Sequence, residues 1–198
     1  MGWPFLRTVL AVGLCLSPAS AAQMSDDAHR IQASVLGVDS HNDTVQHILY
    51  ENVDIGNRLS DGSIDIPRLQ EGGIHVPFFA LWEPTYYKGS ETVRRTLDFR
   101  DAMQTVLDKY PDQIELATSA QDIERIVLRR KIAVVLTVEG GHQMDNDLAV
   151  LRMYRRMGIL SMTLIHFRSN DWAHSSTGKE EHNGLTDFGK EVVRETIT

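Results

Sequence analysis

Residues 132–142 read IAVVLTVEGGH, an apolar run that ends in a carboxylate, two glycines and a histidine. Such a continuous apolar and β-branched run is typical of a strand that is buried on both faces, as in a parallel sheet. A carboxylate that emerges from it is costly to desolvate without a cation or hydrogen-bond donors. Glu139 is therefore a candidate metal ligand, and the glycines after it allow a ligand or a neighbouring strand to approach closely. Read alone, the motif fits a carboxylate on an exposed loop equally well.

Three more apolar runs predict strands, and amphipathic helices are predicted between them. The predicted strands cover residues 35–39, 74–81 and 160–165. Apolar residues at helical spacing predict helices around 103–110 and 148–154. Three residues predict where helices begin or end. Ser119, three residues before Asp122, is a predicted N-cap of a further helix, and Gly158 is predicted to end the helix around 148–154. A last helix is predicted to start near Thr186.

This alternation of strands and helices favours right-handed βαβ units and a parallel α/β fold. A doubly wound sheet and a (β/α)8 barrel both begin in this way, and periodicity does not choose between them. Polar residues at the C-terminal ends of several strands favour the barrel, because barrel enzymes build their sites there. The predicted fold is α/β, a partial (β/α)8 barrel of the TIM type whose first four βα units form a parallel sheet.

Two further strand ends carry polar side chains. The first predicted strand runs into DSHND (39–43), and alternate residues of an extended chain point to the same face, so His41 and Asp43 can aim at one point. A neutral imidazole and a carboxylate suit a divalent ion such as zinc. His166 follows the last predicted strand. Alone, the pair at 41 and 43 also fits a polar turn with a solvated histidine and a helix-capping aspartate.

The charge and the first residues of the chain bear on its partners and location. The formal net charge is −7 and no basic stripe stands out, which argues against nucleic acid as a partner. Arg7, the apolar run 8–16 and the small residues 19–21 predict a secretory signal peptide over residues 1–21, cleaved near Ala21. Cys15, the single cysteine, lies inside this segment, so the mature chain is expected to form no disulfide. The signal peptide predicts export to a periplasm or the extracellular space. Its apolar run is too short to span a bilayer, so no stable membrane anchor is expected.

Taken together, these motifs resemble the membrane (renal-type) dipeptidase family, which are zinc metallopeptidases with a (β/α)8 barrel and a two-metal centre. The resemblance runs from about residue 30 to the end of the chain. The segments that carry it are DSHND (39–43), IDIPRLQEGGIHVPFFALW (64–82), VRRTLDF (93–99), VEGGH (138–142), TLIH (163–166), NDW (170–172) and GLTDFGKEVVRE (184–195).

The resemblance implies roles for four residues. His41 and Asp43 would bind the first zinc, and Glu139, the catalytic residue of the set, would bridge both zinc ions. His166 matches the substrate-contacting histidine of the family. Two metals about 3.5–4 Å apart can share a hydroxide that attacks the scissile carbonyl of a dipeptide substrate. The family resemblance also implies a homodimer.

The chain departs from the family pattern in two respects. Thr44-Val45-Gln46-His47 stands where the family commonly has Leu-Pro and a nearby tryptophan. The family takes two histidines for the second zinc and a late aspartate for the first from later strands, so residues 22–198 are predicted to form the N-terminal half of the barrel domain. Two interpretations stay open at this point: the chain is a fragment of a longer protein, or it is a genuine short protein. The second zinc site is expected to be incomplete and the turnover of this chain by itself to be small or absent.

Two rival functions stay open. One is another metal-dependent barrel hydrolase of the amidohydrolase type, although that type usually shows His-x-His where this chain has His41 and Asp43. The other is a half-barrel without catalysis that acts by binding or assembling with a partner. His142 is expected to have a structural or supporting role, and Trp82 with Tyr86 and Tyr87 is expected to pack in the core or at the rim of the pocket.

Overall fold

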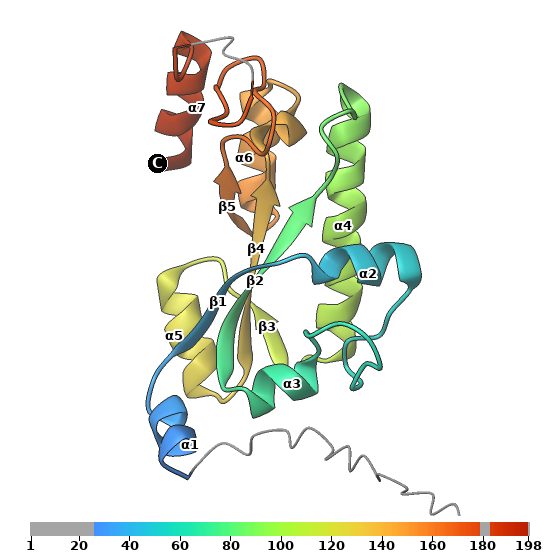
Figure 1. Ribbon diagram of the computed structural model, residues 1–198, viewed down its shortest axis with the longest axis vertical. Coiled ribbons are helices and arrows are strands. Elements are labelled where there is room, and N and C mark those ends of the chain that lie inside the picture. The colour runs from blue at the N-terminus through green and yellow to red at the C-terminus, as the bar shows by residue number, and fades with distance from the viewer. Residues whose placement is uncertain (1–25, 179–182, 198) are drawn as a thin grey trace, which may run out of the picture.

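The computed structural model describes residues 26–178 and 183–197 (Figure 1). The predicted signal peptide, residues 1–21, lies outside the described residues together with Cys15. Within the described ranges, no helix is both long enough and apolar enough to span a bilayer.

Five parallel strands form the centre of the molecule, which confirms the predicted α/β class with a parallel sheet. The strand order is β1-β2-β4-β3, and β5 also pairs with β4. Their bounds are β1 (Gly37–Asn42), β2 (Ile74–Trp82), β3 (Ile114–Leu116), β4 (Ile132–Glu139) and β5 (Ile159–Thr163).

The registers bring three strand ends to the same level. Trp82 of β2 lies opposite Glu139 of β4, and Glu139 lies opposite Thr163 of β5. Because parallel strands all end at one edge of the sheet, the side chains that follow β2, β4 and β5 gather there. This edge is where the candidate site forms.

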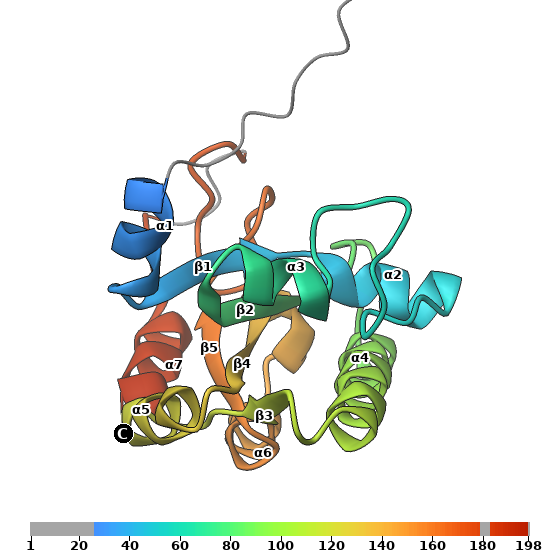
Figure 2. The same cartoon turned by 90° about the horizontal axis from the view of Figure 1, so that it is seen from below.

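Helices cover the sheet and connect its strands. Figure 2 shows α4, α5, α6 and α7 lying below the ribbon of β1 and β2 in that view. The helices are α1 (Asp26–Ala33), α2 (Thr44–Glu51), α3 (Ile66–Glu71), α4 (Ser90–Lys109), α5 (Ala120–Leu128), α6 (Leu148–Arg156) and α7 (Asp187–Ile197), and η1 (Gly141–Met144) is a 3-10 turn.

Strand β4 is buried on both faces, as its apolar run predicts. One set of alternate residues, with Leu136 and Val138, packs in a cluster that includes Phe99 of α4. The other set, with Val135, packs with Ile126 of α5. Fully burying a side chain of this size contributes about 1.5–3 kcal/mol, so β4 anchors the fold and fixes the position of the residues at its end.

All three predicted helix signals are confirmed. The last helix, α7, begins directly after Thr186, whose hydroxyl accepts a hydrogen bond from the Gly189 N–H at 3.2 Å. The Ser119 hydroxyl accepts a hydrogen bond from the backbone N–H of Asp122 at 3.1 Å and caps α5. Gly158 follows α6 with φ of 85°, a left-handed conformation that favours glycine.

Other predicted boundaries were wrong by a few residues. The first strand begins at Gly37 instead of residue 35 and continues to Asn42, so His41 belongs to the strand itself. The last predicted strand, 160–165, spans Ile159–Thr163. The sequence analysis predicted four strands, whereas β3 adds a fifth. With three residues, β3 is too short to show a hydrophobic period.

Candidate metal centre

The end of β1 carries two of the predicted ligands. The pairing of β1 with β2 is irregular between Asp39 and Asn42. Asp39 pairs with Pro77 and Asn42 pairs with Phe79, so β1 has one more residue in this interval than β2. Such a bulge re-aims a side chain and is common beside active sites. It lies at His41, and the Asn42 side chain holds it by donating to the Asp39 carboxylate at 2.8 Å and to the Phe78 carbonyl at 3.1 Å.

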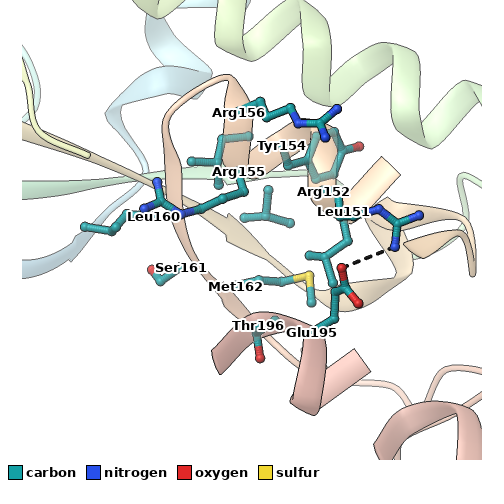
Figure 3. Close-up of a pocket in the computed structure, with 12 residues that line it drawn as sticks. Leu151, Arg152, Tyr154, Arg155, Arg156, Leu160, Ser161, Met162, Glu195 and Thr196 are labelled. Atoms are coloured by element: carbon teal, nitrogen blue, oxygen red, sulfur yellow. Dashed lines mark hydrogen bonds and ion pairs between the residues drawn. The ribbon is translucent and has the colours of Figure 1, made fainter. Parts of the chain in front are cut away.

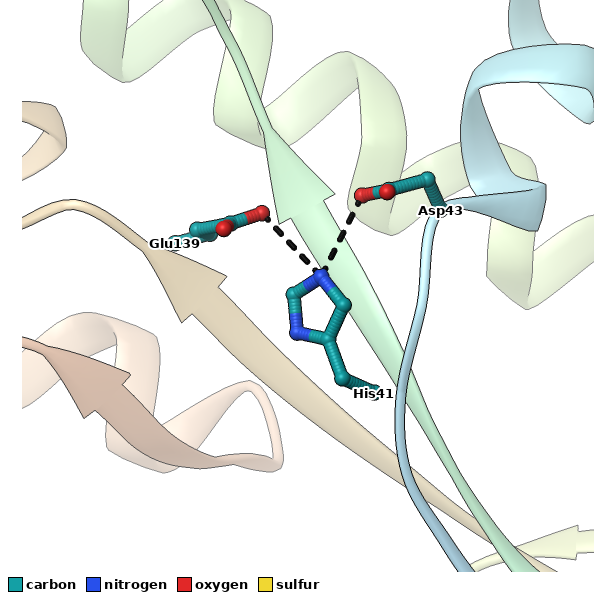
Figure 4. Close-up of side chains that lie close together, drawn as sticks. All are labelled: His41, Asp43 and Glu139. Carbon is teal, nitrogen blue, oxygen red and sulfur yellow. Dashed lines mark ion pairs between the residues drawn. The ribbon is translucent and has the colours of Figure 1, made fainter. Parts of the chain in front are cut away.

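Asp43 stands at the N-cap position of α2, but its side chain makes no capping hydrogen bond. The reading of Asp43 as a helix-capping residue is therefore wrong. Its carboxylate turns toward His41 instead (Figure 4). The first two predicted ligands are thus brought together from the end of β1 and the start of α2.

The third predicted ligand, Glu139, comes from the end of β4 and faces the same histidine. His41 Nε2 lies 3.5 Å from Asp43 Oδ1 and 3.4 Å from Glu139 Oε2 (Figure 4). All three ligand atoms lie within 4.8 Å of one another. With metal–ligand distances near 2.1 Å, two ligands of a tetrahedral zinc ion lie about 3.4 Å apart. The nitrogen and oxygen donors of this cluster therefore fit a single zinc ion.

The electrostatics of the cluster also favour a cation. The Glu139 side chain is only 14% exposed, and this burial raises the pKa of its carboxyl group above the ordinary value. His41 and His166 oppose the rise, and the Asp43 carboxylate adds to it. A bound cation would offset both the desolvation of Glu139 and its repulsion by Asp43.

His166 lies on the other side of Glu139. Its Nε2 atom is 3.2 Å from Glu139 Oε1, so the two oxygens of this carboxylate face two different histidines. The structure thus places all four predicted site residues at one edge of the sheet. His142 stays apart from the three-ligand cluster. Burial, the largest influence, lowers the pKa of its imidazole to about 4, which keeps the ring neutral at neutral pH.

The sequence analysis placed Trp82 in the core or at the rim of the pocket, but it gave no role to Gln46 and no contact to Trp172. The Trp82 indole donates to His166 Nδ1 at 3.3 Å, and Gln46 of α2 donates to the Trp82 carbonyl. At Gly141, a Cβ atom would lie 2.3 Å from the Trp172 ring, so only glycine allows this approach. The NDW motif was quoted for the resemblance, but no local pattern could show that its tryptophan meets the glycine pair.

The candidate site adjoins a cavity. A cavity of about 390 Å³ is lined by His166 and His142 together with the loop that follows β2, including Tyr86 and Tyr87. A second cavity, of about 440 Å³, lies between α6, β5 and α7 and is lined by residues such as Arg152 and Met162 (Figure 3). It contains none of the four site residues, so the cavity beside His166 is the one relevant to the site.

The family model of the membrane dipeptidases, peptidase family M19, matches residues 25–196. The chain belongs to this family. Dipeptidase 3 of Mus musculus is 33% identical over 169 residues, which cover 80% of this chain and 33% of that protein. The M19 chain described here spans a third to a half of the length of the relatives that it matches.

Solved structures of dipeptidases share the fold of this M19 chain. The probable dipeptidase PvdM from Pseudomonas aeruginosa aligns with a TM-score of 0.76 at 19% identity, covering 85% of this chain and 46% of that one. A metallo peptidase from Rhodobacter sphaeroides, liganded with a phosphinate mimic of the dipeptide L-Ala-D-Ala, aligns with a TM-score of 0.71 at 18% identity, covering 81% and 55%. These likenesses confirm the partial barrel.

Proposed function

We propose that this chain provides the first ligands and a substrate-contacting histidine of a zinc-dependent dipeptidase. The observation that carries the proposal is the convergence of His41, Asp43 and Glu139 within 4.8 Å of one another. Membership of a metallopeptidase family supports a metal at this cluster. The phosphinate mimic of a dipeptide bound by the Rhodobacter sphaeroides relative supports a dipeptide as the substrate.

Each of the four site residues has a separate role in this proposal. His41, Asp43 and Glu139 would hold one zinc ion, and Glu139 Oε1 faces His166. Because its two oxygens face in different directions, toward His41 and toward His166, the Glu139 carboxylate suits a bridging role in a two-zinc centre. When bound, zinc supplies Lewis acidity toward the scissile carbonyl and lowers the pKa of a water molecule. His166 holds the dipeptide beside the cluster.

Zinc is the proposed metal because it accepts both imidazole nitrogen and carboxylate oxygen as ligands. The complete centre would hold two zinc ions. Among the residues that the structure describes, Glu139 is the one proposed ligand for the second ion. The further ligands of that ion are therefore expected from the later strands of the family barrel.

The test is hydrolysis of dipeptides by the product of the complete reading frame, with added zinc and after chelation. Chelation should abolish turnover and zinc should restore it. E139Q keeps the size of the side chain but removes its charge, so its kcat/KM should fall by at least about a thousandfold. H47A is the control, because His47 is exposed and pairs with Glu51 of its own helix. Turnover that survives both chelation and E139Q would sink the proposal.

We also propose that the protein is exported and that residues 1–21 are removed. N-terminal sequencing of the protein recovered from outside the cytoplasm should begin shortly after Ala21. A mature protein that still carries Arg7 would contradict this.

A further inference from the structure

The side chain that touches His166 from the far side is Trp82, the last residue of β2. The indole Nε1 atom donates a hydrogen bond to His166 Nδ1 at 3.3 Å. The two rings meet edge to face, with centroids 5.9 Å apart and planes at 69°. The other ring nitrogen, Nε2, lies 3.2 Å from Glu139 Oε1. Each nitrogen of His166 thus has its own partner.

The identity of these partners determines where the proton of the neutral ring sits. An indole nitrogen can only donate, so Nδ1 of His166 must be the acceptor. A neutral imidazole carries one proton, which must then be on Nε2. That N–H points toward Glu139 and the metal cluster. Turning the ring over would leave carbon atoms facing both partners, so the contacts on the two sides also fix its orientation.

We propose that Trp82 is a positioning residue that holds His166 as the Nε2–H tautomer. His166 then meets the dipeptide as a hydrogen-bond donor to a substrate oxygen and not as a proton acceptor. The part about the substrate rests on the proposed dipeptidase function, whereas the part about the tautomer rests on the geometry of the chain itself.

Trp82 is well placed for this role because three segments hold it. Its backbone pairs in register with Glu139 of β4, and its carbonyl accepts a hydrogen bond from Gln46 of α2. The His166 ring is held as well, since it contacts the Phe167 ring, with centroids 4.2 Å apart and planes tilted by 53°, and is only 21% exposed. The Trp82–His166 hydrogen bond therefore ties the end of β2 to the loop after β5.

The direct test is nitrogen NMR of the histidine rings in the metal-free protein, at an alkaline pH where the imidazoles are neutral. The His166 signals are assigned by their absence from H166Q. The expected spectrum shows a protonated Nε2 and an unprotonated Nδ1 that accepts a hydrogen bond. A His166 ring that is protonated at Nδ1 would overturn the proposal.

The role of Trp82 is tested by W82F, which keeps an aromatic ring and removes the indole N–H. The His166 shifts should move to the averaged values of a tautomer mixture. W172F is the matched control, because the Trp172 indole is buried and its N–H has no hydrogen-bond partner within the described residues. Shifts of His166 that are the same in W82F and the wild type would show that Trp82 only packs against the ring.

A second comparison does not depend on how W82F folds. The amide nitrogen of glutamine reaches the position of Nε2, and that of asparagine the position of Nδ1. If His166 donates from Nε2, H166N should weaken binding of a phosphinate analogue of L-Ala-D-Ala about tenfold more than H166Q. Equal losses would contradict the donor role. These binding assays use the product of the complete reading frame, and its failure to bind the phosphinate as wild type would instead contradict the proposed dipeptidase function and leave the NMR result on Trp82 intact.

Discussion

At the scale of single residues, His41 and His47 show how the same residue type takes different roles six positions apart. His41 lies between two carboxylates at a bulge of β1, at 3.5 Å and 3.4 Å. His47 lies on the exposed side of α2 and pairs with Glu51 at 3.0 Å. The difference comes from the neighbours, since only His41 faces side chains from another strand.

This difference predicts the metal affinity of two variants. H41A should weaken zinc binding more than about 100-fold, because even outer-shell partners of a metal site are worth 10–100-fold. H47A should bind zinc like the wild type. Competition with a chelating indicator measures both affinities. Equal affinities for H41A and H47A would remove His41 from the metal site.

A second residue of interest is Glu83, which follows Trp82 and is fully buried. Arg95 Nε lies 3.4 Å from its carboxylate, yet neither carboxylate oxygen accepts a hydrogen bond within the described part of the chain. Burial, the largest influence, raises the pKa of Glu83 to about 8 from its ordinary value of 4.5, although Arg95 opposes the rise. The folded protein therefore keeps a proton on Glu83 at neutral pH.

The raised pKa of Glu83 predicts how stability changes with pH. Below pH 4.5 both the folded and the unfolded state hold this proton. Between pH 4.5 and 8 the unfolded state releases it while the folded state keeps it, so this contribution to the free energy of unfolding falls as the pH rises. E83Q cannot titrate, and between pH 5 and pH 8 it should gain about 3–4 kcal/mol relative to the wild type.

Urea unfolding at the two pH values measures this gain. E124Q is the control, because Glu124 lies on α5 and is exposed. A difference between E83Q and the wild type that stays constant with pH would show that Glu83 is ionised in the folded protein.

At the scale of elements, polar residues cap the N-termini of three helices. Ser119 caps α5, Asp147 caps α6, and Asp65 caps α3. Asp65 is the most buried case. Its carboxylate accepts from the backbone N–H of Arg68 at 2.8 Å and of Leu59 at 3.0 Å, and it pairs with the Arg68 guanidinium at 3.2 Å. It thus fastens the loop before α3 to the helix.

Removing this cap should be costly. D65A should lower the free energy of unfolding by about 2–4 kcal/mol, since it removes an N-cap and leaves buried N–H groups without acceptors. D61A is the control in the same loop, because Asp61 is exposed and accepts only from the adjacent Gly62 N–H at 2.7 Å. Its cost should stay below about 0.5 kcal/mol. Chemical denaturation compares the two, and equal costs would show that Asp65 contributes no more than a surface residue.

At the scale of the whole molecule, the sheet is open at β1 and β5. Within the described ranges, β1 pairs only with β2, and β5 pairs only with β4. Thr137, buried on β4, accepts a hydrogen bond from Ser161 of β5 at 2.8 Å, while Ser161 and Thr163 themselves are exposed.

The described part of the chain holds one group of three metal-binding side chains, which predicts its zinc stoichiometry. The chain of 198 residues should bind close to one zinc ion, and H41A should bind less than half of that at the same free zinc. Equilibrium dialysis with metal analysis gives both numbers. Two tightly bound ions per chain would show that it contains a complete two-metal centre by itself.

Much of this architecture follows from local sequence. The apolar run 132–138 predicts a strand that is buried on both faces, because every side chain of such a strand leaves water. The Ser119 cap follows from hydrogen bonding between residues three apart. The motifs around His41, Glu139 and His166 indicate the dipeptidase family because they keep its residue types and spacing.

Other features were decided only by the tertiary structure. The distances from His41 to Asp43 and Glu139 depend on the bulge in β1 and on the path from β1 through β2 to β4. The hydrogen bond from Trp82 to His166 joins residues 84 positions apart. Periodicity reports which side chains are buried, whereas strand register and long-range packing determine which of them meet. That is why the sequence by itself determined the candidate ligands and the fold class, and only the folded chain decided how they are held.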